Sequence, residues 1–255
     1  MIRSPVLLLL GVSACLAAQL KPEAIQAYER YTHDTEARLA AMRPFLWVDA
    51  SPDRLRRVKE GQVVVAPWKG DGDTDVPGAA IHDWIGAIFI PGGTLAKTLA
   101  VLQDYNHQKD IYPDVPDSHL RSHNGNDFTY TRLRKLHNGP VNGIFRTDFA
   151  AHYQQIDSHR WECITRTTLV DEIEDYGKPN QHELPPGTGS GYLWRLNGYW
   201  RLEQRDGGVY LECETVSLTR ALPPIIGALF ASATHTIERE GLIGTLKATR
   251  DAEKK

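Results

Sequence analysis

Three dipeptides that favour tight turns divide the second half of the chain, and they constrain the fold more than any other feature. They are Asn124-Gly125, Asn138-Gly139 and Asp206-Gly207, and each stands between extended segments. The pattern predicts six strands, at roughly 117–123, 126–136, 141–153, 159–174, 191–204 and 208–219. Strands joined by such short turns run antiparallel, so this region predicts an antiparallel sheet.

Helices are expected on both sides of this strand-rich region. Residues 22–42 have apolar positions at helical spacing, with a proline in the first turn and Pro44 after the end. A short strand "GQVVVAPW", a loop "KGDGDTDVPG", a strand "AIHDWIGAIFI" and a helix opening at Gly92-Gly93 follow. A long helix is predicted at about 223–249. The fold class is therefore α+β, with a curved antiparallel sheet of about seven strands wrapped around the C-terminal helix and an N-terminal helical extension. Such packing buries the apolar surfaces of both sheet and helix.

The register of the last hairpin follows from its turn. In "NGYWRLEQRDGGVYLECE", residues 197–214, a two-residue turn at Asp206-Gly207 places Arg205 opposite Gly208. One face then carries the pairs Leu202–Leu211 and Trp200–Cys213. The other face carries the opposite-charge pair Arg201–Glu212 and the pair Tyr199–Glu214. The carboxylates of this stretch are thus interpreted as outer-face residues with partners, and Cys213 as a small inner-face residue.

Cys163 and Cys213 are expected to remain free thiols. If the strands neighbour one another in chain order, the strand that carries Trp200 separates the two cysteines. Their Cα atoms would then be about 10 Å apart, which is two interstrand spacings. A disulfide requires less than about 7 Å.

The hairpin at Asn124-Gly125 allows two orientations. His119, Arg121, Phe128, Tyr130 and Arg132 share one predicted face, and leucines and threonines share the other. If the polar and aromatic face points inward, it offers donors to a carboxylate or polar head group; if outward, it is a solvated surface. The outward orientation is favoured because a buried arginine needs a partner.

No metal site, cofactor or catalytic residue is predicted. Asp71, Asp73 and Asp75 begin like a calcium loop, but Val76 replaces the sixth-position glycine and His82 the twelfth-position glutamate. No zinc-type spacing of histidines or cysteines is present. The dipeptide His82-Asp83 and His235 are isolated candidates for acid–base work, and a structural role is preferred for each.

The first eighteen residues, "MIRSPVLLLLGVSACLAA", have one arginine, a leucine-rich run and then small residues. This is the pattern of a secretory signal peptide, which predicts an exported protein, periplasmic or secreted. Two alternatives remain: lipidation at Cys15, because "VSAC" resembles a bacterial lipobox, and a buried N-terminal strand. The apolar run from Val6 to Ala18 is shorter than the roughly 20 residues of a membrane-spanning helix, and no other segment approaches that length.

The segments "GYWRLEQRDGGVYLECETVSLTRALPPIIGALF", "REGLIGTLKATR" and "DWIGAIFIPGGTLAKTLAVLQDYNHQKDIYPDV" resemble bacterial START-like proteins of the SRPBCC, or helix-grip, superfamily, which also includes the birch-allergen-like fold. The resemblance covers roughly 80–250 and divides the chain into a signal peptide (1–18), an N-terminal extension (19–79) and a START-like domain (80–250). It implies an apolar ligand between sheet and helix, and no catalytic residue is carried over. The implied cavity lining is Trp194, Leu196, Trp200, Leu202, Leu211, Ile226, Phe230 and Ile237, although each could equally be ordinary core.

Two functions remain in view. The preferred one is a binding protein for a lipid or other hydrophobic small molecule, and the alternative is a cavity-based cyclase or lyase that uses His, Tyr or Arg as acid or base. A third possibility is a collapsed cavity in a domain that serves an envelope assembly. The net charge of −3 argues against a nucleic-acid partner. The sequence predicts no oligomeric state.

Overall fold

The computed structural model describes residues 19–138, 141–221 and 224–254; the side chains of residues 138 and 224–234 are outside this description. The helices are α1 (Pro22–Ala41), η1 (Trp47–Ala50), α2 (Pro52–Lys59), α3 (Leu95–Gln103), α4 (Gln108–Ile111) and α5 (Pro224–Ala252). The strands are β1 (Val64–Pro67), β2 (Asp73–Val76), β3 (Ala79–Pro91), β4 (Asp117–Asn124), β5 (Asp127–Asn138), β6 (Val141–Gln155), β7 (Arg160–Glu174), β8 (His182–Glu183), β9 (Arg195–Arg205) and β10 (Gly208–Arg220).

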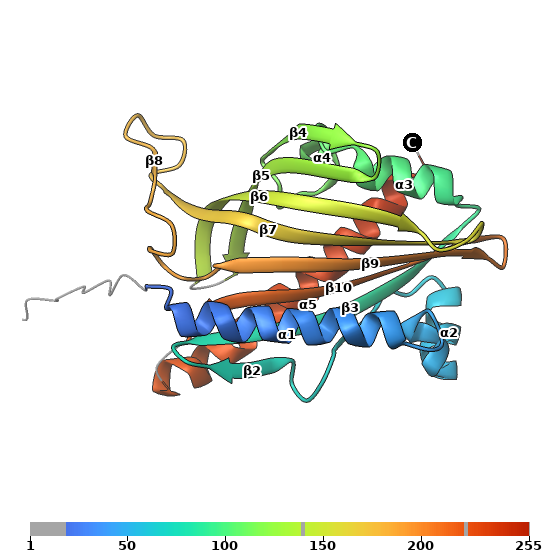
Figure 1. Ribbon diagram of the computed structural model, residues 1–255, viewed down its shortest axis with the longest axis horizontal. Helices are drawn as coiled ribbons and strands as arrows, with labels where there is room; N and C mark the ends of the chain where they lie inside the picture. The colour runs from blue at the N-terminus through green and yellow to red at the C-terminus, as the bar shows by residue number, and fades with distance from the viewer. Residues whose placement is uncertain (1–18, 139–140, 222–223, 255) are drawn as a thin grey trace, which may run out of the picture.

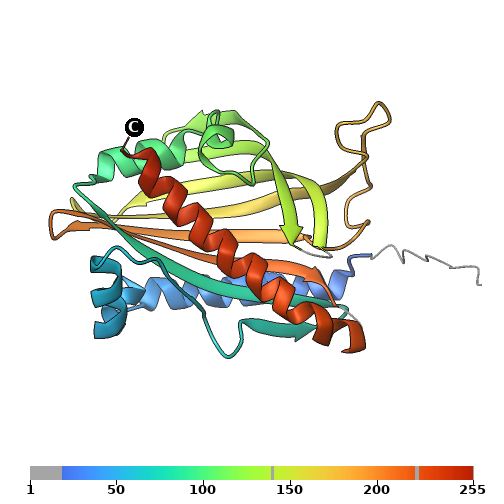
Figure 2. The ribbon, with the colours of Figure 1, turned by 180° about the vertical axis from the view of Figure 1, so that it is seen from behind.

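All strands belong to one antiparallel sheet, in the order β1-β3-β10-β9-β7-β6-β5-β4, with β2 beside β3 and β8 beside β7. Seven of them, β3 to β7 with β9 and β10, correspond to the seven long strands predicted. The two-residue β8 was not predicted. The sheet curves, and α5 crosses its concave side diagonally (Figures 1 and 2). The predicted helix-grip architecture is therefore confirmed.

Five short elements were not anticipated: η1, α2, β2, α4 and β8. The sequence predicts a loop for 69–78, but Asp73–Val76 forms β2 because it pairs with Ala79–His82 around a turn at Pro77-Gly78. The segment between α1 and β1 also forms a short helix, α2, which begins at Pro52 and is capped by the Ser51 hydroxyl.

Close contact between α5 and the sheet depends on a glycine in β3. A Cβ atom at Gly86 would lie 2.9 Å from Leu246 Cδ1 of α5 and 3.0 Å from Val65 Cγ2 of β1. Leu242 and Leu246 are buried at this crossing. The absence of a side chain at Gly86 thus lets α5 pack directly on β3.

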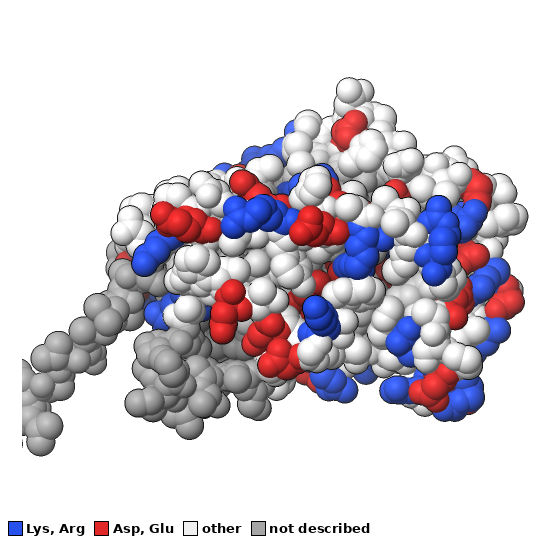
Figure 3. All heavy atoms as spheres, turned by 60° about the horizontal axis from the view of Figure 1, so that its bottom comes forward, with Lys and Arg blue, Asp and Glu red and all other residues white. Residues whose placement is uncertain are grey.

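The outer face of the sheet is covered by the N-terminal elements. Helix α1 lies along β10 and β3, and the hydroxyl of its buried Tyr28 donates to the Val216 carbonyl at 2.8 Å. Tyr28 and Leu39 pack with Tyr199 and Val216 in one apolar cluster. Acidic and basic side chains are interspersed on the face that contains these elements (Figure 3). The extension therefore replaces an apolar sheet surface with a charged exterior.

The predicted register of the β9–β10 hairpin is confirmed, with Trp200 opposite Cys213 and Arg201 opposite Glu212. The partners of these charges come from the N-terminal extension. Glu212 accepts hydrogen bonds from the backbone N–H groups of Trp47 (2.8 Å) and Val48 (2.9 Å). Arg201 donates to the carbonyls of Phe45 and Leu39. These outer-face charges are therefore buried and connect the two ends of the chain.

Cys163 and Cys213 are unpaired, as predicted. Each lies opposite Trp200, one on β7 and the other on β10, so the strand β9 separates them. Burial raises the pKa of both thiols. Within the described part of the chain, no helix is long and apolar enough to cross a membrane.

Candidate functional site

A cavity lies between the inner face of the sheet and the helices α3, α4 and α5. The centre of a water-sized sphere can occupy about 70 Å³ of it. Its wall combines apolar residues with tyrosines, two arginines and two carboxylates: Leu102, Tyr105, Gln108, Tyr112, Asp114, Tyr130, Arg132, Arg134, Phe149, Tyr153, Thr165, Leu196, Gly198, Trp200, Cys213, Thr215, Glu238, Gly241, Leu242 and Thr245. The cavity is therefore bounded by α5 and by strands β5, β6, β7, β9 and β10.

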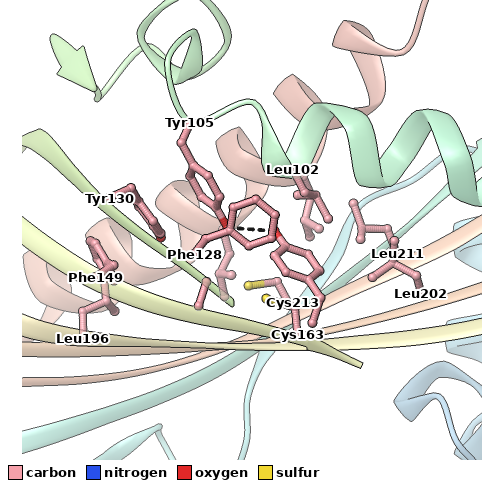
Figure 4. Packing of buried hydrophobic residues seen from close by; sticks show 14 of the residues in the cluster. Leu102, Tyr105, Phe128, Tyr130, Phe149, Cys163, Leu196, Leu202, Leu211 and Cys213 are labelled. Carbon is pink, nitrogen blue, oxygen red and sulfur yellow. Dashed lines mark hydrogen bonds between the residues drawn. The ribbon is translucent and has the colours of Figure 1, made fainter. Parts of the chain in front are cut away.

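Aromatic rings form one side of this cavity. Tyr105, which follows α3, stacks on Tyr130 of β5 with ring centroids 4.0 Å apart, and Tyr130 stacks on Phe149 of β6 at 5.0 Å. The hydroxyls of Tyr105 and Tyr153 lie 2.9 Å apart (Figure 4). Burial raises the pKa of Tyr105 and Tyr130, so both remain neutral phenols near neutral pH. Tyr105, Tyr130 and Phe149 therefore form an aromatic wall of stacked rings that also carries hydroxyl groups.

The orientation favoured for the β4–β5 hairpin was wrong. Phe128 and Tyr130 point inward and are buried, and Arg132 lines the cavity. The guanidinium of Arg132 lies over the Phe149 ring, 4.8 Å from its centroid. The inward packing of two aromatic rings thus outweighed the cost of bringing an arginine inside. The Phe149 ring offsets part of that cost through a cation–π interaction with the guanidinium.

The predicted register of this hairpin was also wrong. The turn residues are Gly125-Asn126, because Asn124 pairs with Asp127. A bulge between Leu120 and Ser122 then places Leu120, rather than Arg121, opposite Tyr130. His119 and Arg121 consequently lie on the outer side, where Arg121 Nε donates to the Thr131 hydroxyl at 2.9 Å.

A second lobe, in which the centre of a water-sized sphere can occupy about 50 Å³, adjoins the main cavity and shares Arg134, Leu196 and Glu238 with it. Its wall also includes Ser217 and Thr219 of β10 and Ile237 of α5. Ser217 donates to Glu238 at 2.7 Å, which connects β10 to α5. The lobe therefore lies where the sheet meets the first half of α5.

A carboxylate between two histidines lies behind the second lobe. Asp73 Oδ1 is 2.6 Å from His82 Nδ1, and Asp73 Oδ2 is 3.1 Å from His235 Nε2. The other nitrogen of His82, Nε2, lies 2.9 Å from the Thr219 hydroxyl. From the sequence, His82 and His235 are expected to be isolated, because Asp73 is expected in a loop. In the structure, β2 pairs with β3 and the three side chains come together.

The charges of this cluster support one another. Burial opposes the charged form of His82, but the hydrogen bond to Asp73 and the nearby charge of Glu238 raise its pKa overall. Burial likewise opposes ionisation of Asp73, and hydrogen bonds from the two histidines lower its pKa overall. Each shift favours the charged form of its group, relative to the same side chain free in water.

The residues predicted to line the cavity are divided among several places. Leu196 and Trp200 line the main cavity, and Leu196 and Ile237 line the second lobe. Leu202 and Leu211 are fully buried core residues outside the walls of both lobes. Ile226 and Phe230 lie outside the described side chains.

Trp194 packs instead with the outer cluster beneath α1. The predicted alternation extends the last hairpin back to residue 191, whereas β9 begins at Arg195. Trp194 therefore precedes the regular strand, and Leu193 takes the inner position beside the second lobe.

Several residues of the cavity wall were not predicted from the sequence, among them Tyr105, Tyr153, Arg134 and Glu238. One signal could have found Arg134: in residues 128–136, every second residue is Phe, Tyr, Arg, Arg or Leu. Strand alternation puts these five on one face. Tyr105 and Glu238 come from helical segments whose rotation about the axis the local pattern does not fix.

No protein-family model matches the chain, and no curated protein matches it. Solved structures with a similar fold include a STAR-related lipid transfer protein fragment from Xanthomonas axonopodis, with 20% identity and a TM-score of 0.47, covering 72% of this chain and 100% of that one. The Zhui aromatase/cyclase from Streptomyces sp. R1128 has 10% identity and a TM-score of 0.43, covering 68% and 94%. Human STARD10 has 7% identity and a TM-score of 0.45, covering 73% and 75%. All three are similar to part of this chain, at TM-scores below 0.5.

Proposed function

We propose that this protein binds a hydrophobic or amphiphilic small molecule in the cavity between the sheet and α5. The observation that carries the proposal is the cavity itself, with its stacked rings of Tyr105, Tyr130 and Phe149. A concave, largely apolar site with a few polar groups is the usual form of a small-molecule site. The aromatic wall supplies contact area, and the polar groups supply orientation.

The test measures binding of a fluorescent apolar probe to the purified protein, with native mass spectrometry to detect any molecule that copurifies. Trp200→Ala removes a partly exposed ring from the cavity wall, and we expect probe affinity to fall about tenfold. Trp68→Ala is the matched control, because Trp68 packs on the outer side, under the guanidinium of Arg38. Unchanged affinity in a folded Trp200→Ala variant would mean that the probe does not use this cavity.

We also propose that residues 1–18 direct export and are removed. Their composition supports this, although their structure lies outside the described residues. Mass spectrometry of the protein from the exported fraction should give an N-terminus near Ala18 or Gln19. An acylated N-terminal Cys15 would instead establish lipidation, and a retained Met1 would contradict both forms of processing.

A second candidate function, acid–base catalysis, is favoured by one observation. His82 is held by Asp73 on one side and lies against the Thr219 hydroxyl on the other, and Thr219 lines the second lobe. An imidazole in this position could exchange a proton with a bound ligand through the Thr219 hydroxyl. If the cavity is catalytic, His82→Gln should stop conversion of the bound molecule without preventing its binding. A ligand that is recovered unchanged from both proteins would exclude this candidate.

A further inference from the structure

Two arginines of β5 face the cavity side by side, and their charges are not fully balanced by the protein. Tyr130, Arg132, Arg134 and Leu136 alternate on the inner face of this strand. Residues two apart on a strand are about 7 Å apart at the backbone. Arg132 and Arg134 can therefore reach one small group together.

We infer that the molecule in this cavity carries an acidic head group, a carboxylate or phosphate, which binds to Arg132 and Arg134. The inference rests on the proposed function, because it names the chemical class of the ligand in the same cavity.

Among the described residues, Arg132 has no carboxylate partner. The nearby ion pairs join Arg134 to Asp114 and Arg146 to Asp148. Its Nε atom is buried and has no hydrogen-bond acceptor there. Segments 1–18, 138–140 and 222–234, whose side chains are not described, contain neither Asp nor Glu. A side-chain counter-ion for Arg132 is therefore not concealed in them.

Arg134 is only partly compensated. Its Nε atom lies 3.7 Å from Asp114 Oδ2, beyond hydrogen-bond distance, and is buried without an acceptor. The second carboxylate of the cavity, Glu238, accepts a hydrogen bond from Ser217 and lies near His82. The two guanidiniums thus keep donors free, and a guanidinium has five of them.

The surroundings would strengthen binding of an anion. Arg132 is half-buried, and its charge affects the pKa values of the buried Tyr112, Tyr130 and Cys213. A charge with little access to water interacts more strongly with an opposite charge. An acidic group at Arg132 would satisfy the free donors and offset the cost of the buried cation.

The cavity wall also offers an apolar surface for the rest of the ligand. Leu102, Tyr105, Trp200 and Leu242 line the interior beyond the arginines. Arg134 also lines the second lobe and a groove between β5 and α5, in which the centre of a water-sized sphere can occupy about 340 Å³. The arginine pair therefore lies between an apolar interior and a surface groove, and an amphiphilic acid matches this order.

The experiment compares ligands with one alkyl chain and different head groups: palmitate, hexadecyl phosphate, hexadecanol and hexadecylamine. Displacement of the fluorescent apolar probe gives the affinity of each. We expect an acid to bind about tenfold to a hundredfold more tightly than hexadecanol, the gain usual for hydrogen bonds to a charged group. Palmitate against hexadecyl phosphate distinguishes a carboxylate ligand from a phosphate ligand.

Variants then assign the preference to residues. Arg132→Gln should lower acid affinity by about the same factor and leave hexadecanol affinity unchanged, while Arg132→Lys should retain part of the preference. Arg121→Gln is the matched control, because Arg121 lies on the outer side of β4. If Arg132→Gln does not fold, as judged by circular dichroism, Arg134→Gln and the wild-type series decide the question.

The outcomes separate the two proposals. Equal affinity of the wild-type protein for hexadecanol and both acids would overturn the acidic head group and leave the binding function standing. Failure of every chain to displace the probe would count against the binding function itself. A preference for acids that survives in both Arg132→Gln and Arg134→Gln would also overturn the assignment to this pair.

Discussion

At the scale of single residues, the most unusual group is a carboxyl under α1. Asp83 is buried on the outer face of β3, accepts a hydrogen bond from the Tyr31 hydroxyl at 2.8 Å and faces the buried Glu214. Burial first, and then the negative charge of Glu214, raises the pKa of Asp83 to about 8. In the unfolded chain its pKa would be about 4. The folded protein therefore holds a proton that the unfolded chain releases.

This proton makes stability depend on pH in a defined direction. Because the folded-state pKa is the higher one, its contribution is fully present below about pH 4 and is lost as the pH rises toward about 8. We expect Asp83→Asn to unfold with a free energy about 1–3 kcal/mol higher than wild type near pH 9, since the amide keeps an acceptor for Tyr31 without a charge.

Urea denaturation at several pH values measures this effect. The control is Asp75→Asn, an exposed position on β2, which should leave the pH dependence as in wild type. If Asp83→Asn loses stability with rising pH as steeply as wild type does, Asp83 is not the group that holds the proton.

At the scale of elements, Gly86 determines how closely α5 packs on β3. Gly86→Ala would press a methyl group against Leu246 and Val65, and we expect a loss of about 1–3 kcal/mol in the free energy of unfolding. Gly244→Ala is the matched control within α5, since a Cβ there meets nothing within 4 Å. It should instead stabilise the helix by about 0.5–1 kcal/mol. Thermal unfolding of both variants checks the difference; equal effects of the two would contradict the close packing at Gly86.

The elements also show which parts of the fold were predictable. Asp206-Gly207 forms a two-residue turn, which places Arg205 opposite Gly208. Counting outward from that pair gives the partners of Leu202 to Tyr199 correctly. The hairpin of β4 and β5 did not follow, because the bulge after Leu120 has no clear local signal and shifts every side chain beyond it.

The candidate site was less predictable than the sheet. Alternation identified Leu196 and Trp200 as inner-face residues, and both line the cavity. Asp73, His82 and His235 meet only because β2, β3 and α5 come together, which is a tertiary fact. The inward position of Arg132 was decided by the packing of neighbouring rings, which outweighed the general rule that charges avoid the interior.

At the scale of the whole molecule, the N-terminal extension and the sheet form one structure. Removal of residues 19–62 would uncover Tyr199 and leave Glu212 and Arg201 without their backbone partners. We expect this truncated chain to aggregate or to lose fixed tertiary packing, because unpaired buried charges are costly. Near-ultraviolet circular dichroism and binding of a hydrophobic dye measure this. A truncated protein with a cooperative unfolding transition close to that of the full chain would show that the sheet and α5 are sufficient.

The pairing of β3 with β10 has a consequence for the timing of folding. β3 is the first long strand to be synthesised and β10 the last, yet they are neighbours along their whole length, from Ala79–Arg220 to Pro91–Gly208. Until a ribosome has released β10, β3 lacks its neighbour on that side and α1 lacks part of the surface on which it rests. Such non-local pairing makes folding slow and leaves apolar strands uncovered meanwhile. The apolar residues of β3 therefore lack this neighbour until almost the whole chain has been synthesised.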